Sequence, residues 1–401
     1  MARDPVTAVL TGDLNMVRCF DDAGLRTMLV GSDPDDLKFH SRSGASRLIA
    51  DPRTEPERAV DDLVALGKAL PGRPALFYDS DPMLVLISRN RVVLERYFRF
   101  RMPDPELVEA LASKVEFDGL ARRLDLPVPK TVLSRDVSSG REAAAKLTLP
   151  CMFKPVSHAG WYTSDVVVEA GAKPFKALLA ETYEQFLALW KKMSRFDRDF
   201  VVQEYVPGRD SCIYSFHAYL DDRSRPLGYF VGQKLRTYPK TSGVSTYLEL
   251  THDAEVERLG FEILSRMKFV GPVKLDFKKD EARGRFYLLE MNPRFNLWHH
   301  LGAACGINLP RIAYDDLFGT ASAARFTEYR TGVRWLSFGN DARAFLRDYR
   351  PGGELTLAQW LWSLRGEKIH DVFSWRDPQP FGAWLMRYAS TFARARLGSV
   401  R

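Results

Sequence analysis

The sequence predicts a mixed fold, in which an α/β domain with an open parallel sheet is followed by an α+β region. Residues 6–31 indicate a strand (VTAVL), a helix over about 16–23 and a second strand, which is how a doubly wound parallel sheet begins. Later in the chain, strand-like segments are separated by short turns. The segment 273–296, VKLDFKKDEARGRFYLLEMNPRFN, reads as two antiparallel strands joined by a charged turn at Gly284.

Composition is that of a globular protein of several units. A chain of 401 residues exceeds one small core, so roughly two or three units are expected. Hydrophobic residues make up 45% and charged residues 27%, which excludes disordered and fibrous classes. The N-terminus lacks the apolar core of a signal peptide, and the apolar runs are too short to span a bilayer. Four scattered cysteines without a CxxC pair predict reduced thiols in a cytoplasmic protein.

The positive charge is concentrated at the C-terminal end. The net charge is +7, and residues 321–401 hold 13 Arg and Lys against 7 Asp and Glu, a balance of +6. No nucleic-acid motif accompanies this charge. A predicted helix near the C-terminus carries Phe381, Trp384, Leu385, Tyr388 and Phe392 on one face. Such a face more often packs on the body of the protein, and the alternative is a peripheral membrane or partner-docking helix.

The N-terminal domain is expected to end near residue 113. A helix over about 56–70, the strand PALFYDS and helices over 83–98 continue the α/β pattern. Gly12 stands alone and is no dinucleotide fingerprint. Asp13 and the Ser41–Arg42 pair are candidates for a substrate cleft, although capping and surface roles are commoner.

A helical stretch over 106–123 contains Lys114, and the apolar strand LPCMFKPV ends in Lys154. A lysine at the end of a buried strand needs a polar partner, because burial without one is costly. The following SHAGWYTS has one glycine and fits a phosphate-covering loop that is poor in glycine. The helix over 181–194 shows an apolar packing face.

The stretch FVVQEYVPGRD is a strand with a turn that leads to Asp210, and two more strands follow, the second with Lys234 and Arg236. Free backbone groups on a strand edge suit an adenine ring, which needs an acceptor for N6 and a donor for N1. An acid a few residues on can bind ribose hydroxyls. The alternative for Glu204 and Asp210 is a solvated strand end.

The hairpin of 273–296 places oxygen ligands together. Alternation puts Lys274 and Asp276 on one face, and antiparallel pairing brings Asp276 opposite Glu290, with Asn292 just beyond. Carboxylate and amide oxygens suit Mg²⁺ carrying phosphates, and the alternative is a hairpin with solvated charges. Beyond it, the adjacent His299 and His300 point apart and make a poor chelating pair.

Six features taken in chain order resemble the ATP-grasp superfamily: Lys114, FKP, QEYVPGRD, QKLR, VKLDF and LLEMNPRF. They are most similar to its predicted carboxylate–amine ligase branch, which includes D-aspartate ligase-like proteins. The resemblance implies the ATP-grasp fold. A Rossmann-like pre-ATP-grasp domain over 1–113 would precede an ATP-grasp domain over 114–320, with a lid subdomain over about 130–205. Residues 321–401 would form a basic, aromatic-rich and mainly helical C-terminal region that matches no part of the family.

The resemblance also implies roles for individual residues. Lys154 and Lys114 would contact phosphates, and Lys234 and Arg236 would lie along the triphosphate or an acyl phosphate. Arg294 and Lys274 would face the transferred phosphoryl group or the substrate carboxylate. Adenine would be bound by Gln203, Glu204, Tyr205 and Val206, ribose by Asp210, and one or two Mg²⁺ ions, or Mn²⁺, by Asp276, Glu290 and Asn292.

The implied activity is an ATP-dependent carboxylate–amine or carboxylate–thiol ligase that acts on a small molecule or amino acid through an acyl phosphate. One alternative is a bicarbonate-activating enzyme like carbamoyl-phosphate synthase or biotin carboxylase. The other is a non-catalytic, ATP-binding regulatory protein at the membrane surface. A homodimer is the default expectation.

Overall fold

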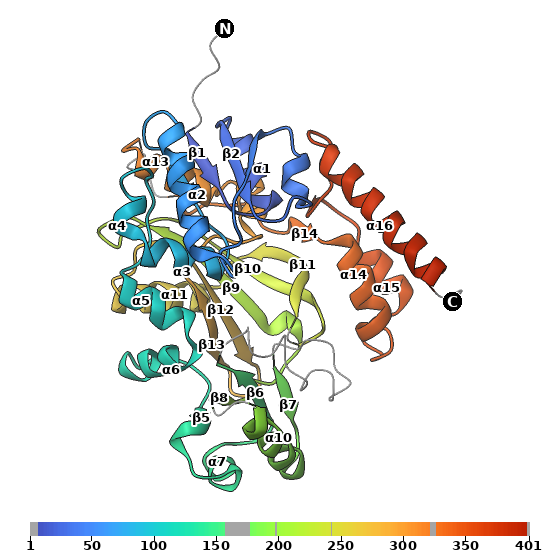
Figure 1. Ribbon diagram of the computed structural model, residues 1–401. Coiled ribbons are helices and arrows are strands. Elements are labelled where there is room, and N and C mark those ends of the chain that lie inside the picture. The colour runs from blue at the N-terminus through green and yellow to red at the C-terminus, as the bar shows by residue number, and fades with distance from the viewer. Residues whose placement is uncertain (1–6, 157–176, 197–198, 242, 321–325, 399–401) are drawn as a thin grey trace.

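The computed structural model describes residues 7–156, 177–196, 199–241, 243–320 and 326–398. Within these ranges it contains a parallel sheet at the N-terminal end, a large central sheet, and a small antiparallel sheet at the opposite end (Figure 1). None of the described helices has the length and apolarity that a bilayer crossing requires.

The first sheet is parallel throughout and has the order β3-β2-β1-β4. The chain winds in opposite directions from β1, so the carboxyl ends of β1 and β4 form a topological switch point, where open α/β sheets bind ligands. The start predicted from residues 6–31 is confirmed. The strands are β1 (Ala8–Leu10), β2 (Thr27–Gly31), β3 (Gly44–Leu48) and β4 (Ala75–Phe77), and the helices are α1 (Leu14–Asp22), η1 (Leu37–His40), α2 (Pro56–Ala69), α3 (Asp81–Arg89) and α4 (Arg91–Leu94).

The stretch expected as one helix over 106–123 forms two, α5 (Pro105–Ala112) and α6 (Lys114–Arg123). Ser113 has an extended backbone between them, and its hydroxyl accepts a hydrogen bond from the amide of Glu116. The break is therefore an N-cap inside a helical pattern.

The small sheet has the order β5-β8-β6-β7 and is antiparallel. Its helices α7 and α10 cover one face, where Phe153, Phe186 and Phe200 form a core. The elements are β5 (Thr131–Leu133), η2 (Ser134–Asp136), α7 (Gly140–Lys146), β6 (Cys151–Pro155), β7 (Leu178–Ala180), α10 (Tyr183–Phe196) and β8 (Phe200–Glu204).

The central sheet has the order β13-β12-β9-β10-β11-β14-β15. Its last two strands come from beyond residue 321, so the C-terminal region, expected to be mainly helical, also extends this sheet. The elements are η3 (Asp210–Cys212), β9 (Ile213–Leu220), β10 (Pro226–Tyr238), β11 (Val244–Thr251), α11 (Ala254–Arg266), β12 (Gly271–Asp280), β13 (Arg285–Asn292), α12 (His299–Ala304), α13 (Leu309–Leu317), β14 (Arg334–Leu336), α14 (Phe338–Ala344), the π-helix η4 (Phe345–Tyr349), α15 (Leu357–Ser363), β15 (Lys368–His370) and α16 (Gln379–Gly398).

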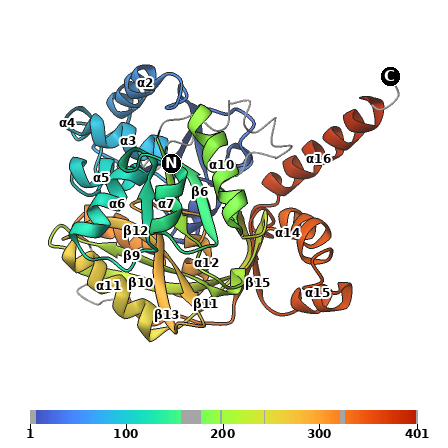
Figure 2. The ribbon, with the colours of Figure 1, turned by 90° about the horizontal axis from the view of Figure 1, so that it is seen from below.

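Alternation along β9 separates two cores. Phe216 and Ala218 face the core beneath α11, whereas Tyr219 faces a core that also contains Phe20 and Phe77 of the N-terminal domain. This shared core fixes the N-terminal domain against the central sheet. The helices α14, α15 and α16 lie together at one side, and α16 projects from the body (Figure 2).

Candidate active site

A row of polar side chains crosses the central sheet on the face that carries Tyr219. Asp276 on β12 is paired in register with Glu290 on β13 and with Ser215 on β9, so the convergence expected of the hairpin is observed. The Asp276 carboxylate accepts a hydrogen bond from the Ser215 hydroxyl. Its other oxygen lies 3.0 Å from the ammonium of Lys234 and 2.8 Å from that of Lys274.

Two ammonium groups hold Asp276 ionised. Burial alone would raise its pKa, but Lys234 and Lys274 outweigh burial and keep the pKa well below its usual value. Burial lowers the pKa of Lys274, whereas for Lys234 the attraction of Asp276 outweighs burial and raises the pKa. Asp276 thus anchors two cations, which differs from the open metal-ligand position expected from the sequence.

Glu290 is exposed, and no described residue donates a hydrogen bond to its carboxylate. Its charge nevertheless acts on Lys154 as well as on Lys234, Lys274 and Arg294. Since Lys154 belongs to the small sheet, Glu290 lies where the two sheets approach each other. Charges of this kind, four cations that act on one exposed carboxylate, are chemically suited to a polyanion and a metal ion.

The small sheet supplies Lys154 at the end of β6. Its ammonium donates a hydrogen bond of 2.7 Å to the side-chain carbonyl of Gln203 on β8. Burial lowers the pKa of Lys154, and Glu290 opposes that shift. Gln203 is in turn fixed by Thr131, whose hydroxyl accepts from its amide at 3.1 Å. The loop expected to cover phosphates, residues 157–165, lies outside the described residues.

The segment expected to hold adenine follows β8. The amides of Glu204 and Tyr205 already donate to the carbonyls of Lys130 and Pro150. No described residue accepts a hydrogen bond from the amide of Val206, so this donor is available for a ligand.

Lys278 was not identified from the sequence. It lies on β12 with the same parity as Lys274 and Asp276, and its ammonium donates to the Tyr205 hydroxyl at 3.2 Å. Burial lowers its pKa, and Asp210 opposes that shift. The alternation that placed Lys274 and Asp276 on one face was the signal that could have found it.

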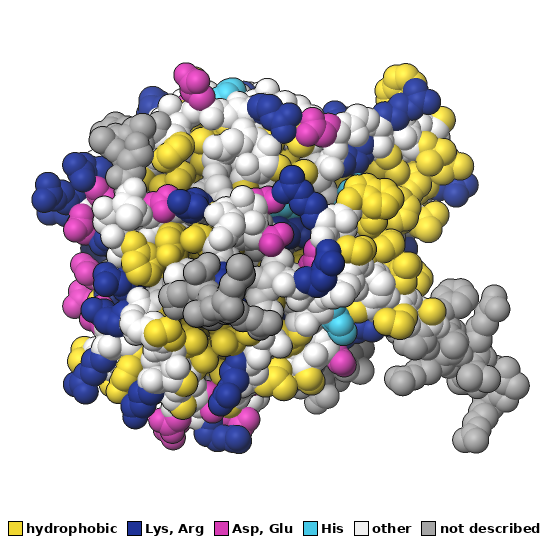
Figure 3. Space-filling view, turned by 90° about the horizontal axis from the view of Figure 1, so that it is seen from above, with side chains coloured by type: hydrophobic (Ala, Val, Ile, Leu, Met, Phe, Trp, Pro, Cys, Tyr) yellow, Lys and Arg dark blue, Asp and Glu magenta, His cyan; other side chains and the backbone are white. Residues whose placement is uncertain are grey.

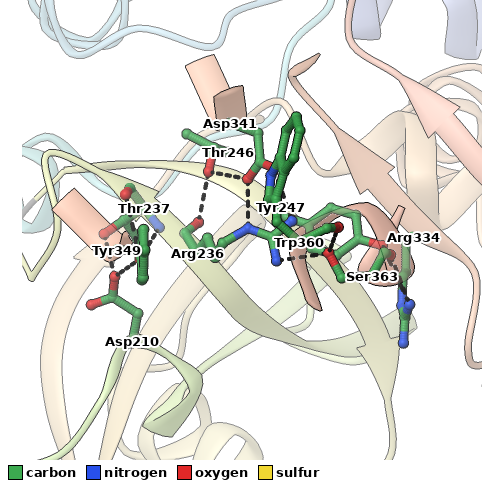
Figure 4. A network of polar contacts seen from close by, with 10 residues as sticks. All are labelled: Asp210, Arg236, Thr237, Thr246, Tyr247, Arg334, Asp341, Tyr349, Trp360 and Ser363. Atoms are coloured by element: carbon green, nitrogen blue, oxygen red, sulfur yellow. Dashed lines mark hydrogen bonds and ion pairs between the residues drawn. The ribbon is translucent and has the colours of Figure 1, made fainter. Parts of the chain in front are cut away.

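Asp210 is bound by the protein itself. Its carboxylate is buried and accepts hydrogen bonds from the Thr237 hydroxyl at 2.7 Å and from the Tyr349 hydroxyl (Figure 4). It also accepts one from the Thr241 amide at 3.2 Å. The Tyr349 oxygen also accepts from the Thr237 amide at 2.9 Å. The carboxylate expected to bind ribose therefore ties β10 to the C-terminal region.

Arg236 is likewise engaged with the C-terminal region (Figure 4). Two of its nitrogens donate to the two carboxylate oxygens of Asp341, each at 2.8 Å, and Asp341 is fully buried. Trp360 and Thr246 donate to the same carboxylate at 2.9 and 3.0 Å. The guanidinium also lies 4.2 Å from the ring centroid of Tyr247. This position differs from the expected place along the triphosphate.

A bulge explains why Lys234 and Arg236 separate. Lys234 pairs with Leu248 and Arg236 with Tyr247, so one extra residue of β10 lies between them. A second irregularity follows immediately on β11. Bulges re-aim side chains, and strict alternation had put both cations on one face.

Arg294 connects the hairpin to the N-terminal domain. Its guanidinium pairs with Asp81 at the start of α3, donates to the Asp79 carbonyl at 2.8 Å, and reaches the Asn292 side-chain oxygen at 3.4 Å. Asn292 and Arg294 therefore lie beside the switch point of the parallel sheet. Lys114 begins α6, where the adjacent Val115 packs on Leu133 and Val201 of the small sheet.

The switch point itself is acidic. Asp13 caps α1, and its amide donates to the Asp79 carboxylate at 2.8 Å. Burial and the neighbouring Asp13 raise the pKa of Asp79 to about 7. Lys38 is buried and donates to the carbonyl of Gly12 at 3.0 Å, which adds a fixed positive charge beside the pair.

Trp298 and His299 are core residues, and His300 beside them is half-buried. Trp298 and His299 are buried between the N-terminal domain and the central sheet, where their rings contact His217. Burial lowers the pKa of His299 to about 4 and that of His300 to about 3, so both are neutral. Within the described ranges, no three His, Cys, Asp or Glu side chains form a metal-binding group.

Comparison with known proteins links the chain to ligases. It is 26% identical to D-aspartate ligase of Enterococcus faecium over 238 residues, which are 58% of this chain and 55% of that protein. It is 24% identical to the carbamoyl phosphate synthase large chain of Clostridium acetobutylicum, over 73% of this chain and 27% of that one. The chain therefore spans about half of the first curated relative and about a quarter of the second. No protein-family model matches it.

Solved structures share the fold. Biotin carboxylase of Campylobacter jejuni has a TM-score of 0.59 at 15% identity, covering 80% of this chain and 73% of that one. N5-carboxyaminoimidazole synthetase of Staphylococcus aureus has a TM-score of 0.60 at 12% identity, with 82% and 81% covered. L-amino acid ligase of Bacillus licheniformis has a TM-score of 0.56 at 13% identity, with 79% and 75% covered. These likenesses confirm the fold class predicted from the sequence.

Proposed function

We propose that this chain, which has the ATP-grasp fold, is an ATP-dependent carboxylate–amine ligase that acts on a small molecule or an amino acid. The proposal rests on Lys234 and Lys274, whose ammonium groups lie 3.0 and 2.8 Å from the Asp276 carboxylate, which pairs in register with Glu290. The charge of Glu290 also acts on Lys154 and Arg294. Lys154 comes from one sheet and the other cations from the second sheet and the segment after it. Nucleotide phosphates held between the two sheets would meet cations from both sides. The likeness to D-aspartate ligase supports carbon–nitrogen bond formation, and a thiol in place of the amine is a variant of the same chemistry.

The chemistry follows from the charges. A carboxylate is a poor acyl donor, so its oxygen attacks the γ-phosphorus of ATP and ADP leaves, which gives an acyl phosphate. The amine then attacks the acyl carbon, phosphate leaves with the acyl C–O electron pair, and the amine gives up a proton. The cationic side chains offset charge on the transferred phosphoryl group, so positioning and electrostatics do most of the catalysis.

Two of the three expected metal ligands have side-chain oxygens that are suited to a divalent cation as the structure stands. Glu290 and Asn292 present oxygens that suit Mg²⁺, or Mn²⁺ in its place. Asp276 would become the third ligand once the ammonium groups of Lys234 and Lys274 have moved to phosphate oxygens. A bound cation neutralises phosphate charge and orients the transferred group.

Two roles implied by the resemblance are revised in this proposal. Asp210 and Arg236 act as positioning residues, because Tyr349 and Asp341 already occupy their charged groups. Adenine would lie against the edge formed by Gln203, Glu204, Tyr205 and Val206. Lys114 would approach the phosphates from α6.

The acid and amine are proposed to bind between Arg294 and the switch point of the N-terminal domain. Arg294 pairs there with Asp81, which is half-exposed and can yield to a substrate carboxylate. Asp13 and Asp79 lie beside it, and their carboxyl oxygens can accept hydrogen bonds from an ammonium group.

The test is phosphate release from ATP over a panel of acid–amine pairs. We expect phosphate release to require both substrates and Mg²⁺. We also expect Glu290→Gln to lower its rate. The matched control is Glu262→Gln on the solvent face of α11. A Glu290→Gln enzyme with the turnover of the control would overturn the site assignment.

The second candidate is activation of bicarbonate, favoured by the carbamoyl phosphate synthase relative. Bicarbonate-dependent ADP formation without any organic acid would distinguish it. The third, a non-catalytic ATP-binding protein, predicts ATP binding without turnover for every pair.

We further propose a cytoplasmic location and a homodimer as working assignments. The four cysteines are all free and buried, which agrees with a reducing compartment. The membrane contact expected of the C-terminal helix is a separate proposal, and it rests on the exposed side chains of α15 and α16.

A further inference from the structure

The C-terminal helices expose an unusual share of large hydrophobic side chains. Of the sixteen such side chains in the described residues, nine lie between residues 338 and 388. Trp362 on α15 is 67% exposed, and Trp375, just before α16, is 87% exposed. Figure 3 shows hydrophobic side chains gathered at this end of the molecule. The nine, called here the C-terminal surface, are Phe338, Leu346, Leu357, Leu361, Trp362, Trp375, Leu385, Met386 and Tyr388.

The helices that carry this surface are held together. Phe338 contacts the buried Trp360 of α15, and Trp360 stacks on Phe345. Gly339 faces Trp384 of α16, 3.2 Å from where a Cβ would be. The hydrophobic side chains therefore project from one fixed unit, which is joined to the central sheet through Asp341.

The charge beside the surface is one-sided. Arg343, Arg347, Arg350 and Arg365 are exposed and make no ion pair with a described residue. Arg365 lies 4.1 Å from the ring centroid of Trp362. All six acids between 338 and 388 are buried or bonded to other parts of the chain: Asp341, Asp348, Glu354, Glu367, Asp371 and Asp377.

This charge argues against a second copy of the chain as the partner. A two-fold dimer would place the same surface on both sides, and unpaired arginines would then face each other. Apolar and aromatic side chains flanked by arginine are what bind the interface of a bilayer whose headgroups are anionic.

We propose that the C-terminal surface docks the protein on a membrane with anionic headgroups. Leu361 and Trp362 enter the interface, and the surrounding arginines lie at headgroup level. The bound protein would present the nucleotide site at the membrane without crossing it. This inference is independent of the reaction that the site performs.

The experiment is co-sedimentation of the full chain with vesicles of phosphatidylcholine alone and of phosphatidylcholine mixed with phosphatidylglycerol. Binding to the mixed vesicles only, weakened by salt, is expected. The double variant Leu361→Ser/Trp362→Ser should bind at least about tenfold more weakly, from the area withdrawn from the bilayer. Arg365→Glu should weaken binding about fivefold or more.

Val92→Ser is the matched control, because Val92 on α4 is 73% exposed and belongs to the N-terminal domain. It should bind vesicles as the unaltered chain does. Equal binding to both vesicle types, no binding to either, or unchanged binding of the double variant would overturn the proposal. So would a dimer, seen by sedimentation without lipid, that the double variant dissociates.

Discussion

Variants of the buried ion pair between Arg236 and Asp341 test whether Arg236 has a structural or a catalytic role. Asp341→Asn keeps the volume of the side chain but removes the charge that faces the guanidinium. Both carboxylate oxygens accept from Arg236 at 2.8 Å, and neither residue is more than 5% exposed. Breaking such a pair from one side leaves an uncompensated buried charge, which costs about 3 to 5 kcal/mol.

The loss can be converted into a melting temperature. Unfolding entropy of about 2 cal/mol/K per residue gives about 0.8 kcal/mol/K for a chain of this length that unfolds as one unit. Asp341→Asn should therefore lower the melting temperature by about 4 to 6 °C. The matched control, Glu262→Gln, weakens two exposed pairs, with Arg258 and Arg266, and should lower it by about 1 °C or less.

A double variant separates the two roles. Arg236→Met/Asp341→Asn removes both charges and should regain part of the lost stability, because no buried charge is left uncompensated and the new amide oxygen can still accept a hydrogen bond from Trp360 or Thr246. If Arg236 only positions β10, the double variant also keeps kcat for phosphate release within a few-fold. Circular dichroism melts and steady-state kinetics measure both. A stable double variant with no turnover would refute the structural reading, as would an Asp341→Asn protein that melts with the control.

Three further predictions concern single side chains. Glu290→Gln should lower Mg²⁺-dependent turnover by about 100-fold or more in a phosphate-release assay and leave the melting temperature unchanged, since Glu290 is exposed. Folding raises the pKa of Asp79 from 3.8 to about 7, so between these pH values the folded state holds a proton that the unfolded state has lost. The stability of the unaltered chain therefore falls as the pH rises from about 4 to about 7. The melting temperature of Asp79→Asn, relative to that of the unaltered chain, should rise over this range and stay higher above it. Tyr349→Phe removes the hydroxyl that donates to Asp210 and should cost about 1 to 3 kcal/mol in a denaturant titration, whereas an unchanged midpoint would show that this bond contributes nothing.

The strand pattern predicted much of the site. Period-two alternation placed Asp276 and Glu290 opposite each other, and the register of β12 and β13 has them so. The same alternation places Lys278 on this face of β12, although Lys278 belongs to none of the motifs that resemble the family. Local alternation therefore sufficed along β12, which pairs with β9 without a register shift.

The sequence could not predict what the C-terminal region does to the site. Asp341 lies 105 residues beyond Arg236, and nothing local marks it as a partner. The bulge in β10 also breaks the alternation that put Lys234 and Arg236 on one face. Long-range pairing and an inserted residue thus give Arg236 and Asp210 partners within the chain, Asp341 and Tyr349, that no local pattern indicates.

The transfer of oxygen from the acid to phosphate distinguishes an acyl-phosphate route from any other route to the amide. A carboxylic acid labelled with heavy oxygen in its carboxylate would be used in the acid–amine pair that releases phosphate fastest. If the carboxylate oxygen attacks the γ-phosphate, the released phosphate carries one labelled oxygen from the acid, visible by phosphorus NMR. Amide formation with unlabelled phosphate would contradict the acyl-phosphate intermediate.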